Sequence, residues 1–493
     1  MDPNLPGPSR AKKQKVSFKD PNNVTDEELL AVLEASDSEI DELLGISDSD
    51  DEYILEGGCE SEESDYDDGE GRNFVFLFVY SYIAYFLVDA VLQTQLPQTH
   101  TQPSTLASGS IIPTWSSNPT ALKVFPFTKR NELLQLIPGN NEPIDYFRAI
   151  FDNNILELIV RETNNYAETV FLAVGTTEKS RITRWKPVTS AEMLTFVGSL
   201  LHTGTIRTNR LQDYWKRHPL FNLQSFSKHM SRDRFLLIMR CLHFAENGPA
   251  GVPTDRLHKI NPFLNFFNEK MAVLYYPQRE LSLDESMVLW RGRLVFRQYI
   301  KNKKHKYGIK LYVLTEPCGV ILKVLIYTRA MDNLGGKGHT TKVVLDLMRN
   351  YLDSGHSLYL DNFYNSFELA NELTNRRTYC TGTLNAKRKN NPKAVIDKKL
   401  KKGEITGQYS NDIIVGKWKD KREVLYISNE YENNMIEYTD RQNRAREKPT
   451  PIYYYNKFMG GVDHQDQLSA YYPCERKSLR WYKQLGIHLI HLM

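Results

Sequence analysis

The spacing of apolar residues along the chain changes near Pro277. Before this proline, apolar residues recur at intervals of three and four, as they do on one face of an amphipathic helix. The clearest run extends from Thr189 to Gly204. At its start, Thr189 and Glu192 form a capping box, in which the side chain of each residue accepts a hydrogen bond from the backbone amide of the other. We therefore predict that residues 126–277 form an all-helical domain.

After Pro277, short runs alternate between apolar and polar residues, which is typical of β-strands. The predicted order is three strands, a helix, a strand, a helix and a strand. Strands joined through a helix usually run parallel, so we expect an α/β fold with a mixed central sheet flanked by helices. The predicted strands are residues 280–284, 307–313, 320–327, 357–361 and 379–384, and the predicted helices are residues 343–352 and 366–374.

The charge is distributed unevenly along the chain. Residues 1–72 carry 22 Asp and Glu against 6 Lys and Arg, with few large apolar residues, and we expect them to form a disordered acidic arm. The rest of the chain carries 57 Lys and Arg against 38 Asp and Glu, which favours a polyanionic partner such as nucleic acid. A short basic run at residues 10–15 is a weak signal for import into the nucleus.

Residues 73–92 form a Phe- and Tyr-rich apolar run unlike its surroundings. The 16 uncharged residues before Asp89 are fewer than the ~20 that span a bilayer as a helix. Three interpretations stay open: retained non-coding sequence, a buried or partner-binding segment, and, least favoured, a membrane anchor. With the Pro-, Ser- and Thr-rich linker that follows, this atypical segment covers residues 73–125.

Overall composition is that of a globular chain, with 41% hydrophobic and 25% charged residues, which argues against a polytopic membrane protein. The five cysteines are widely scattered and none has CxxC spacing. Disulfide frameworks and cysteine-rich zinc sites therefore have no support, and a reducing compartment is expected.

Three groups of carboxylates are candidates for metal chemistry. Asp284 and Asp361 each close a predicted strand, and strand ends are where ligands sit in open α/β sheets. Asp463 and Asp466 are separated by three residues, so they share one face of a helix. Converging carboxylates suit two Mg²⁺ or Mn²⁺ ions, which promote attack on a phosphodiester. Taken singly, each aspartate is better explained as a helix cap or turn former, and it is the coincidence of all three with a basic chain that favours metal chemistry.

Basic residues lie close to these carboxylates in the sequence. Lysines alternate with tyrosines between Tyr299 and Tyr312, a composition that binds phosphates and stacks on bases, although the same lysines could simply solvate a hairpin edge. An insertion at residues 385–452 holds further lysine-rich runs and a predicted hairpin of residues 413–418 and 423–427. The candidate DNA-binding residues are Arg291, Arg293, Lys301, Lys304, Lys306, Lys310, Lys387, Arg388, Lys389, Lys398, Lys399 and Trp481.

Five ordered stretches together resemble the successive motifs of piggyBac-type transposases, over about residues 120–493. The stretches are LSLDESMVLWRGR (281–293), YIKNKKHKYGIKLY (299–312), LYLDNFYNS (358–366), YNKFMGGVDHQDQ (455–467) and RKSLRWY (476–482). The resemblance implies an RNase H-like core whose Asp284, Asp361 and Asp463 bind two divalent metals, with Asp466 as a further acidic position. It also implies nicking of transposon ends, a hairpin intermediate, insertion into TTAA targets, a homodimer, and a tryptophan, here Trp481, near the active site.

The hydrophobic pattern and the resemblance together predict further domains after the acidic arm and the linker. They are a helical dimerisation and DNA-binding domain (126–277), the first part of the RNase H-like core (278–384), the DNA-contacting insertion domain (385–452) and the second part of the core (453–493). No cysteine-rich zinc segment follows the last residues, so we expect no zinc and doubtful recognition of transposon ends.

Two functions therefore stay open from the sequence. One is a metal-dependent transposase in the nucleus, which is active only if the lack of the cysteine-rich segment does not inactivate it. The other is a domesticated, catalytically inactive DNA-binding nuclear protein. A small-molecule substrate is not expected. A phosphoaspartate hydrolase is disfavoured because Asp284 has no second aspartate two positions on.

Overall fold

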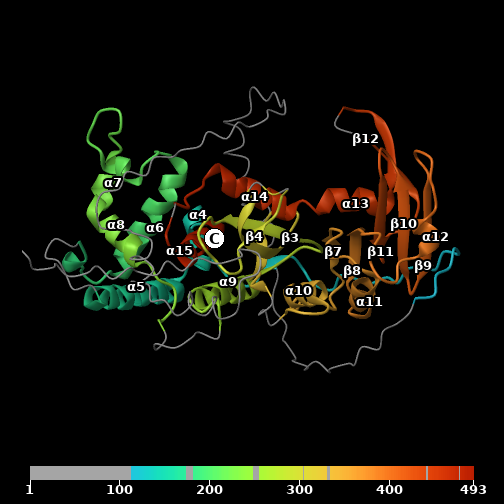
Figure 1. Ribbon diagram of the computed structural model, residues 1–493, viewed down its shortest axis with the longest axis horizontal. Helices are drawn as coiled ribbons and strands as arrows, with labels where there is room; N and C mark the ends of the chain where they lie inside the picture. Colours follow the sequence, from blue (N-terminus) through green and yellow to red (C-terminus); the bar gives the residue numbers. More distant parts are fainter. Residues whose placement is uncertain are drawn as a thin grey trace, which may run out of the picture.

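The computed structural model describes residues 113–173, 181–247, 255–301, 303, 305–329, 334–439, 442–476 and 478–493. The predictions for the acidic arm, for residues 73–92 and for Lys304 lie outside this part of the chain. The molecule is elongated, with helices α5–α8 at one end and strands β9–β11 at the other (Figure 1). Among the described residues, no helix is both long and apolar enough to cross a membrane.

The described part of the segment before Pro277 is mainly helical. Its apolar faces form one core together with the C-terminal helix α15, Trp481–Leu492. Two short strands, β1 (Glu132–Leu133) and β2 (Tyr275–Tyr276), pair antiparallel within this segment, so the prediction that it is all-helical is wrong at its edges. The helices are α4 (Pro143–Ile150), α5 (Asn153–Ala173), α6 (Ser190–Thr205), α7 (Gln224–His229), α8 (Arg232–Cys241) and α9 (Asn261–Leu274).

Helix α6 illustrates how the sequence sets a helix start. Thr189 caps it by accepting a hydrogen bond from the backbone amide of Glu192, and the apolar positions Met193, Phe196 and Leu200 are buried. The second half of the predicted capping box does not form. The carboxylate of Glu192 instead accepts two hydrogen bonds of 2.7 Å from the Arg234 guanidinium on α8, because a bidentate ion pair is stronger than a bond to one amide.

The predicted order of strands and helices after Pro277 is confirmed. Strand β3 pairs antiparallel with β5 and parallel with β7, and β7 pairs parallel with β8, which makes the sheet mixed. Helices α10 (His339–Leu347) and α11 (Phe367–Asn375) pack their apolar residues on one face of it. The strands are β3 (Glu280–Leu289), β4 (Gln298–Tyr299), β5 (Tyr307–Thr315), β6 (Ile321–Ile326), β7 (Ser357–Leu360) and β8 (Tyr379–Thr383).

The insertion continues this sheet. Strands β10 (Ile413–Lys419) and β11 (Glu423–Ser428) form the predicted hairpin, and β9 (Ile405–Ser410) pairs with β10. Strand β11 pairs antiparallel with β8, so the sheet order is β4-β5-β3-β7-β8-β11-β10-β9, with β6 on β5. The chain then passes through the hairpin β12 (Met435–Thr439) and β13 (Ala445–Pro449). Helices α13 (Thr450–Phe458) and α14 (Gly461–Tyr471) bring it back over the core strands (Figure 1).

Candidate active site

Asp284 and Asp361 lie side by side on neighbouring parallel strands. The register pairs Leu283 of β3 with Leu360 of β7, so the next residues along both strands, the two aspartates, occupy adjacent positions. Strand β7 ends just before Asp361, as predicted, but β3 continues to Leu289. Asp284 therefore lies within a strand and not at its end, because its antiparallel pairing with β5 extends five residues further.

Helix α14 carries the third carboxylate across the face of β3 that also bears Asp284 and Ser286. Ser286 of β3 donates a hydrogen bond of 2.6 Å to Asp466, which attaches the helix to the strand. A Cβ atom at Gly461, the first residue of α14, would lie 2.5 Å from Ser282 Oγ. Only glycine fits here without displacing the helix, so this position sets where Asp463 and Asp466 lie relative to the sheet.

One ammonium group joins two of these carboxylates. Lys303 Nζ lies 3.2 Å from Asp463 Oδ1 and 3.5 Å from Asp284 Oδ2. The phenol of Tyr455 on α13 is affected by the charges of all three aspartates. Its pKa is raised to about 12, first by burial and then by the negative charges of Asp361, Asp284 and Asp463. The structure thus brings together the three aspartates that the sequence analysis selected.

Asp284, Asp361 and Asp466 are held in a poorly solvated environment, whereas the side chain of Asp463 is 73% exposed. Burial raises the pKa of Asp284 to about 8, and the neighbouring Glu285 carboxylate contributes to the increase. Burial also raises the pKa of Asp361 and of Asp466. Each shift means that the folded protein disfavours the ionised carboxylate unless a cation compensates it.

A buried ion pair supports β3 from the other face of the sheet. Glu285 accepts a hydrogen bond of 2.9 Å from Lys310 on β5, and both side chains are about nine-tenths buried. Lys310 also lies over the rings of Tyr312 and Phe363. The prediction that Lys310 binds DNA is therefore wrong, because its charge is already compensated inside the fold.

The oxygen ligands fit a hard divalent cation such as Mg²⁺ or Mn²⁺. In this arrangement, however, no three of the four aspartates have ligand atoms within 4.8 Å of one another, among the residues the structure describes. Lys303 lies between Asp284 and Asp463, where a cation would bind. Binding of an ion by all of these ligands requires Lys303 to withdraw and the carboxylates to approach one another.

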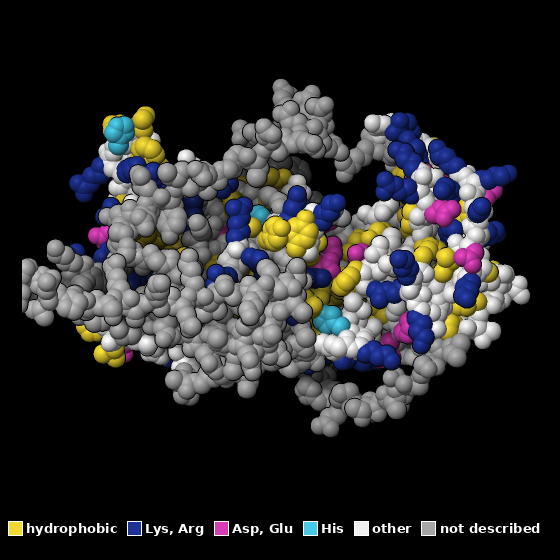
Figure 2. All heavy atoms as spheres, viewed as in Figure 1, with side chains coloured by type: hydrophobic (Ala, Val, Ile, Leu, Met, Phe, Trp, Pro, Cys, Tyr) yellow, Lys and Arg dark blue, Asp and Glu magenta, His cyan; other side chains and the backbone are white. Residues whose placement is uncertain are grey.

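The other candidate DNA-binding residues divide into exposed and packed groups. Trp481 is half-buried and packs edge-on against Phe296, with ring centroids 5.2 Å apart, so it belongs to the helical core. Arg388 is half-buried and donates a hydrogen bond to the Phe363 carbonyl. The exposed members are Arg291, Arg293, Lys301, Lys306, Lys387, Lys389, Lys398 and Lys399. Figure 2 shows many Lys and Arg side chains over the end of the molecule that carries β9–β12.

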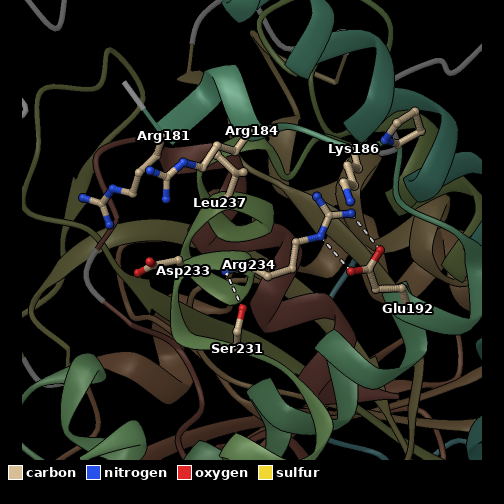
Figure 3. A pocket seen from close by; sticks show the side chains of 9 residues that line it. Arg181, Arg184, Lys186, Glu192, Ser231, Asp233, Arg234 and Leu237 are labelled. Atoms are coloured by element: carbon tan, nitrogen blue, oxygen red, sulfur yellow. Dashed lines mark hydrogen bonds and ion pairs between the residues drawn. The ribbon is translucent and has the colours of Figure 1, made fainter. Parts of the chain in front are cut away.

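A basic pocket of about 400 Å³ lies in the helical part, between the turn at residues 181–187 and helices α6 and α8 (Figure 3). Arg181, Arg184 and Lys186 line it beside the Arg234–Glu192 ion pair. The Arg234 guanidinium also lies 4.9 Å from the ring centre of Trp185. Three cationic side chains around one opening favour a phosphate-bearing ligand.

Sequence reasoning missed the supporting residues of the site. Ser286, Glu285 and Tyr455 lie within the stretches that resemble the family, but nothing in their residue type or spacing assigned them a role. The signal for Glu285 was its position one residue after Asp284 in a strand with two buried faces, where a charged side chain needs a partner.

Comparisons with known proteins identify the family of this chain. A family model described as Transposase IS4 matches residues 142–493. The human PiggyBac transposable element-derived protein 3 is 26% identical over 355 residues, which cover 69% of this chain and 58% of that protein. The human PiggyBac transposable element-derived protein 2 is 26% identical over 363 residues, with the same two shares. The chain thus spans less than two thirds of the length of these relatives.

A similar fold occurs in a solved structure, the cryo-EM structure of a piggyBac transposase synaptic complex with hairpin DNA. The match has a TM-score of 0.64 at 23% sequence identity and covers 74% of this chain and 75% of that one. The family model and these similarities together show that the chain belongs to the transposase family, as a piggyBac-type transposase or a protein derived from one.

Proposed function

We propose that this chain catalyses metal-dependent phosphodiester hydrolysis and strand transfer on DNA through an RNase H-like core. The observation that carries the proposal is that Lys303 contacts Asp284 and Asp463, from segments far apart in the sequence, while the β3–β7 register places Asp361 next to Asp284. Carboxylates with raised pKa values need a compensating cation, and such clusters occur at functional sites more often than elsewhere.

In this proposal Asp284, Asp361 and Asp463 hold two Mg²⁺ or Mn²⁺ ions, and Asp466 assists from the next turn of α14. When bound, such ions activate a water or a 3′-hydroxyl and stabilise the departing oxygen of a phosphodiester. The protein's own contribution is positional. The β3–β7 register fixes two ligands and Ser286 fixes Asp466, while Lys303 would move from the carboxylates to a DNA phosphate when ions bind.

We further propose that the partner is double-stranded DNA, bound by a homodimer in the nucleus, with transposon ends and TTAA targets as substrates. These details follow from the resemblance to the family. The exposed lysines of the insertion and the basic pocket of Figure 3 support a DNA path over both ends of the molecule.

A second function is favoured by the position of Lys303. Its ammonium already offsets part of the charge of two aspartates and occupies the place of an ion, as expected for a domesticated protein that binds DNA and does not cleave it.

One assay separates these functions. Purified protein is incubated with Mn²⁺ and labelled duplex DNA carrying candidate ends. A transposase nicks the DNA, the Asp361→Asn variant does not, and both bind DNA with similar salt dependence. Salt-sensitive binding without nicking by the unmodified protein would assign it to the domesticated class.

A further inference from the structure

A second cluster of ligand-type side chains lies outside the candidate active site. Cys474, Glu475 and His491 each present a ligand atom, and these atoms lie within 4.8 Å of one another. Cys474 is fully buried, and the side chains of Glu475 and His491 are less than one-fifth exposed. The first two come from the segment after α14, and the third comes from α15, so the cluster joins two elements that are separate in the chain.

A fourth side chain supports the cluster. His488 precedes His491 by three residues and shares its face of α15. Its Nδ1 lies 2.7 Å from Glu475 Oε1, and His491 Nδ1 lies 3.3 Å from the same oxygen. The other ring nitrogen of His488 is buried, and it has no hydrogen-bond partner among the residues that the structure describes. The Glu475 carboxylate is thus contacted by two imidazoles and adjoins a buried thiol, which gathers oxygen, nitrogen and sulfur ligand atoms from two segments of the chain.

The backbone of this segment is held in place independently of any ligand. A Cβ atom at Gly204, in α6, would lie 3.4 Å from the amide nitrogen of Cys474 and would overlap the backbone of Tyr472. Arg476 donates hydrogen bonds to the carbonyls of Thr203 and Thr208, at 3.1 and 3.2 Å. The ligand set is therefore preorganised by packing on both sides.

We propose that Cys474, Glu475 and His491 form a zinc site, with His488 as the residue that orients the Glu475 carboxylate. Thiolate, imidazole and carboxylate are the ligands zinc takes in proteins, and the sulfur disfavours Mg²⁺ and Mn²⁺. The expectation of no zinc rested on the absence of cysteines at CxxC spacing and of a cysteine-rich segment after the last residues. A site with a single cysteine and two histidines on the last helix has no such signature in the sequence.

Zinc at this site would fasten α15 to the chain immediately after α14, the helix that carries Asp463 and Asp466. It would thereby stabilise the position of the candidate ligands without taking part in their chemistry. The site is independent of the proposed nuclease function, since none of its ligands is one of the candidate aspartates.

Cobalt substitution tests the proposal, because Co²⁺ bound to a thiolate absorbs in the near ultraviolet and Co²⁺ bound to carboxylates alone does not. The full chain, freed of metal by chelation, is titrated with Co²⁺. We expect a thiolate-to-cobalt band that saturates near one equivalent and is displaced by Zn²⁺. His488→Gln should weaken binding by about 10–100-fold, as outer-layer changes do.

Matched cysteine variants identify the thiolate that produces the absorption band. The band should disappear in Cys474→Ser and remain in Cys380→Ser, a buried cysteine in β8, and in Cys318→Ser, an exposed one. A folded unmodified protein without a thiolate band would overturn the proposal even if Cys474→Ser failed to fold. A band that persists in folded Cys474→Ser, or that is lost in Cys318→Ser, would also overturn it.

Discussion

Lys303 places its ammonium 3.2 Å from a carboxylate oxygen of Asp463, a residue 160 positions further along the chain. The lysine occupies the space that a metal ion would need between Asp463 and Asp284. An ammonium and a divalent cation bound to the same oxygens exclude each other. Affinity of the site for metal is therefore reduced by the free energy of the lysine contacts.

Replacing this lysine should strengthen metal binding. We expect Lys303→Met to bind Mn²⁺ about tenfold more tightly than the unmodified protein, corresponding to about 1.4 kcal/mol. Isothermal titration calorimetry measures the change. Lys301→Met, two residues away and exposed, serves as the control and should bind Mn²⁺ with unchanged affinity. Equal affinities in both variants would mean that Lys303 does not compete with the ion.

Neutralising Asp284 should stabilise the metal-free protein. Its folded-state pKa of about 8 lies above the unfolded value near 4, so the folded state holds the proton more strongly. The associated stability is present below about pH 4 and is lost as the pH rises through 8. We expect Asp284→Asn to raise Tm in EDTA more at pH 8 than at pH 5, by about 2–4 °C for each kcal/mol recovered.

Added Mn²⁺ should remove the gain in Tm that Asp284→Asn shows in EDTA. Mn²⁺ raises Tm of the unmodified protein by binding the folded state, and it should have little effect on Asp284→Asn. A Tm difference between the two proteins that does not change with pH would show that Asp284 is ionised in the folded protein throughout.

Breaking the buried Glu285–Lys310 pair should be costly. Glu285→Gln leaves the Lys310 ammonium buried without its counter-charge, and we expect a loss of about 3–5 kcal/mol in the free energy of unfolding. The double variant Glu285→Gln/Lys310→Met should recover most of this loss. Asp353→Asn, which breaks the exposed Arg376–Asp353 pair, should cost less than about 1 kcal/mol in the same urea titration. Similar losses for the buried and exposed pairs would contradict this account.

Adjacent glycines at the start of α14 provide a matched comparison. A methyl group at Gly461 would overlap atoms of Ser282 and Thr315, whereas one at Gly460 meets no heavy atom within 4 Å. Gly461→Ala should therefore lower Tm and reduce Mn²⁺ affinity, because α14 moves away from β3 together with Asp463, at a cost of about 1–3 kcal/mol. Gly460→Ala should behave as the unmodified protein does. An unchanged Mn²⁺ affinity in Gly461→Ala would show that the helix can shift without disturbing the site.

The sequence predicts the fold well where apolar periodicity is strong. The apolar positions of α6 and α10 and the hairpin of β10 and β11 all follow the spacing of buried residues. The choice of Asp284, Asp361 and Asp463 rested on strand ends and on resemblance, and the β3–β7 register explains why two of them meet. Side-chain contacts between segments far apart in the sequence had no signal in the spacing of apolar residues. Neither the contact of Lys303 with Asp463 nor the burial of Lys310 can be read from local spacing, because both depend on tertiary packing.

The pairing of β8 with β11 also determines how the chain can be altered. Excising residues 385–452 would leave β8 as an open sheet edge with unpaired amide and carbonyl groups next to the segment that follows Leu360. Such edges recruit strands from other molecules. Shortened versions of this protein are thus at risk of self-association, and the insertion cannot be exchanged as an autonomous module in the way that a tethered domain can.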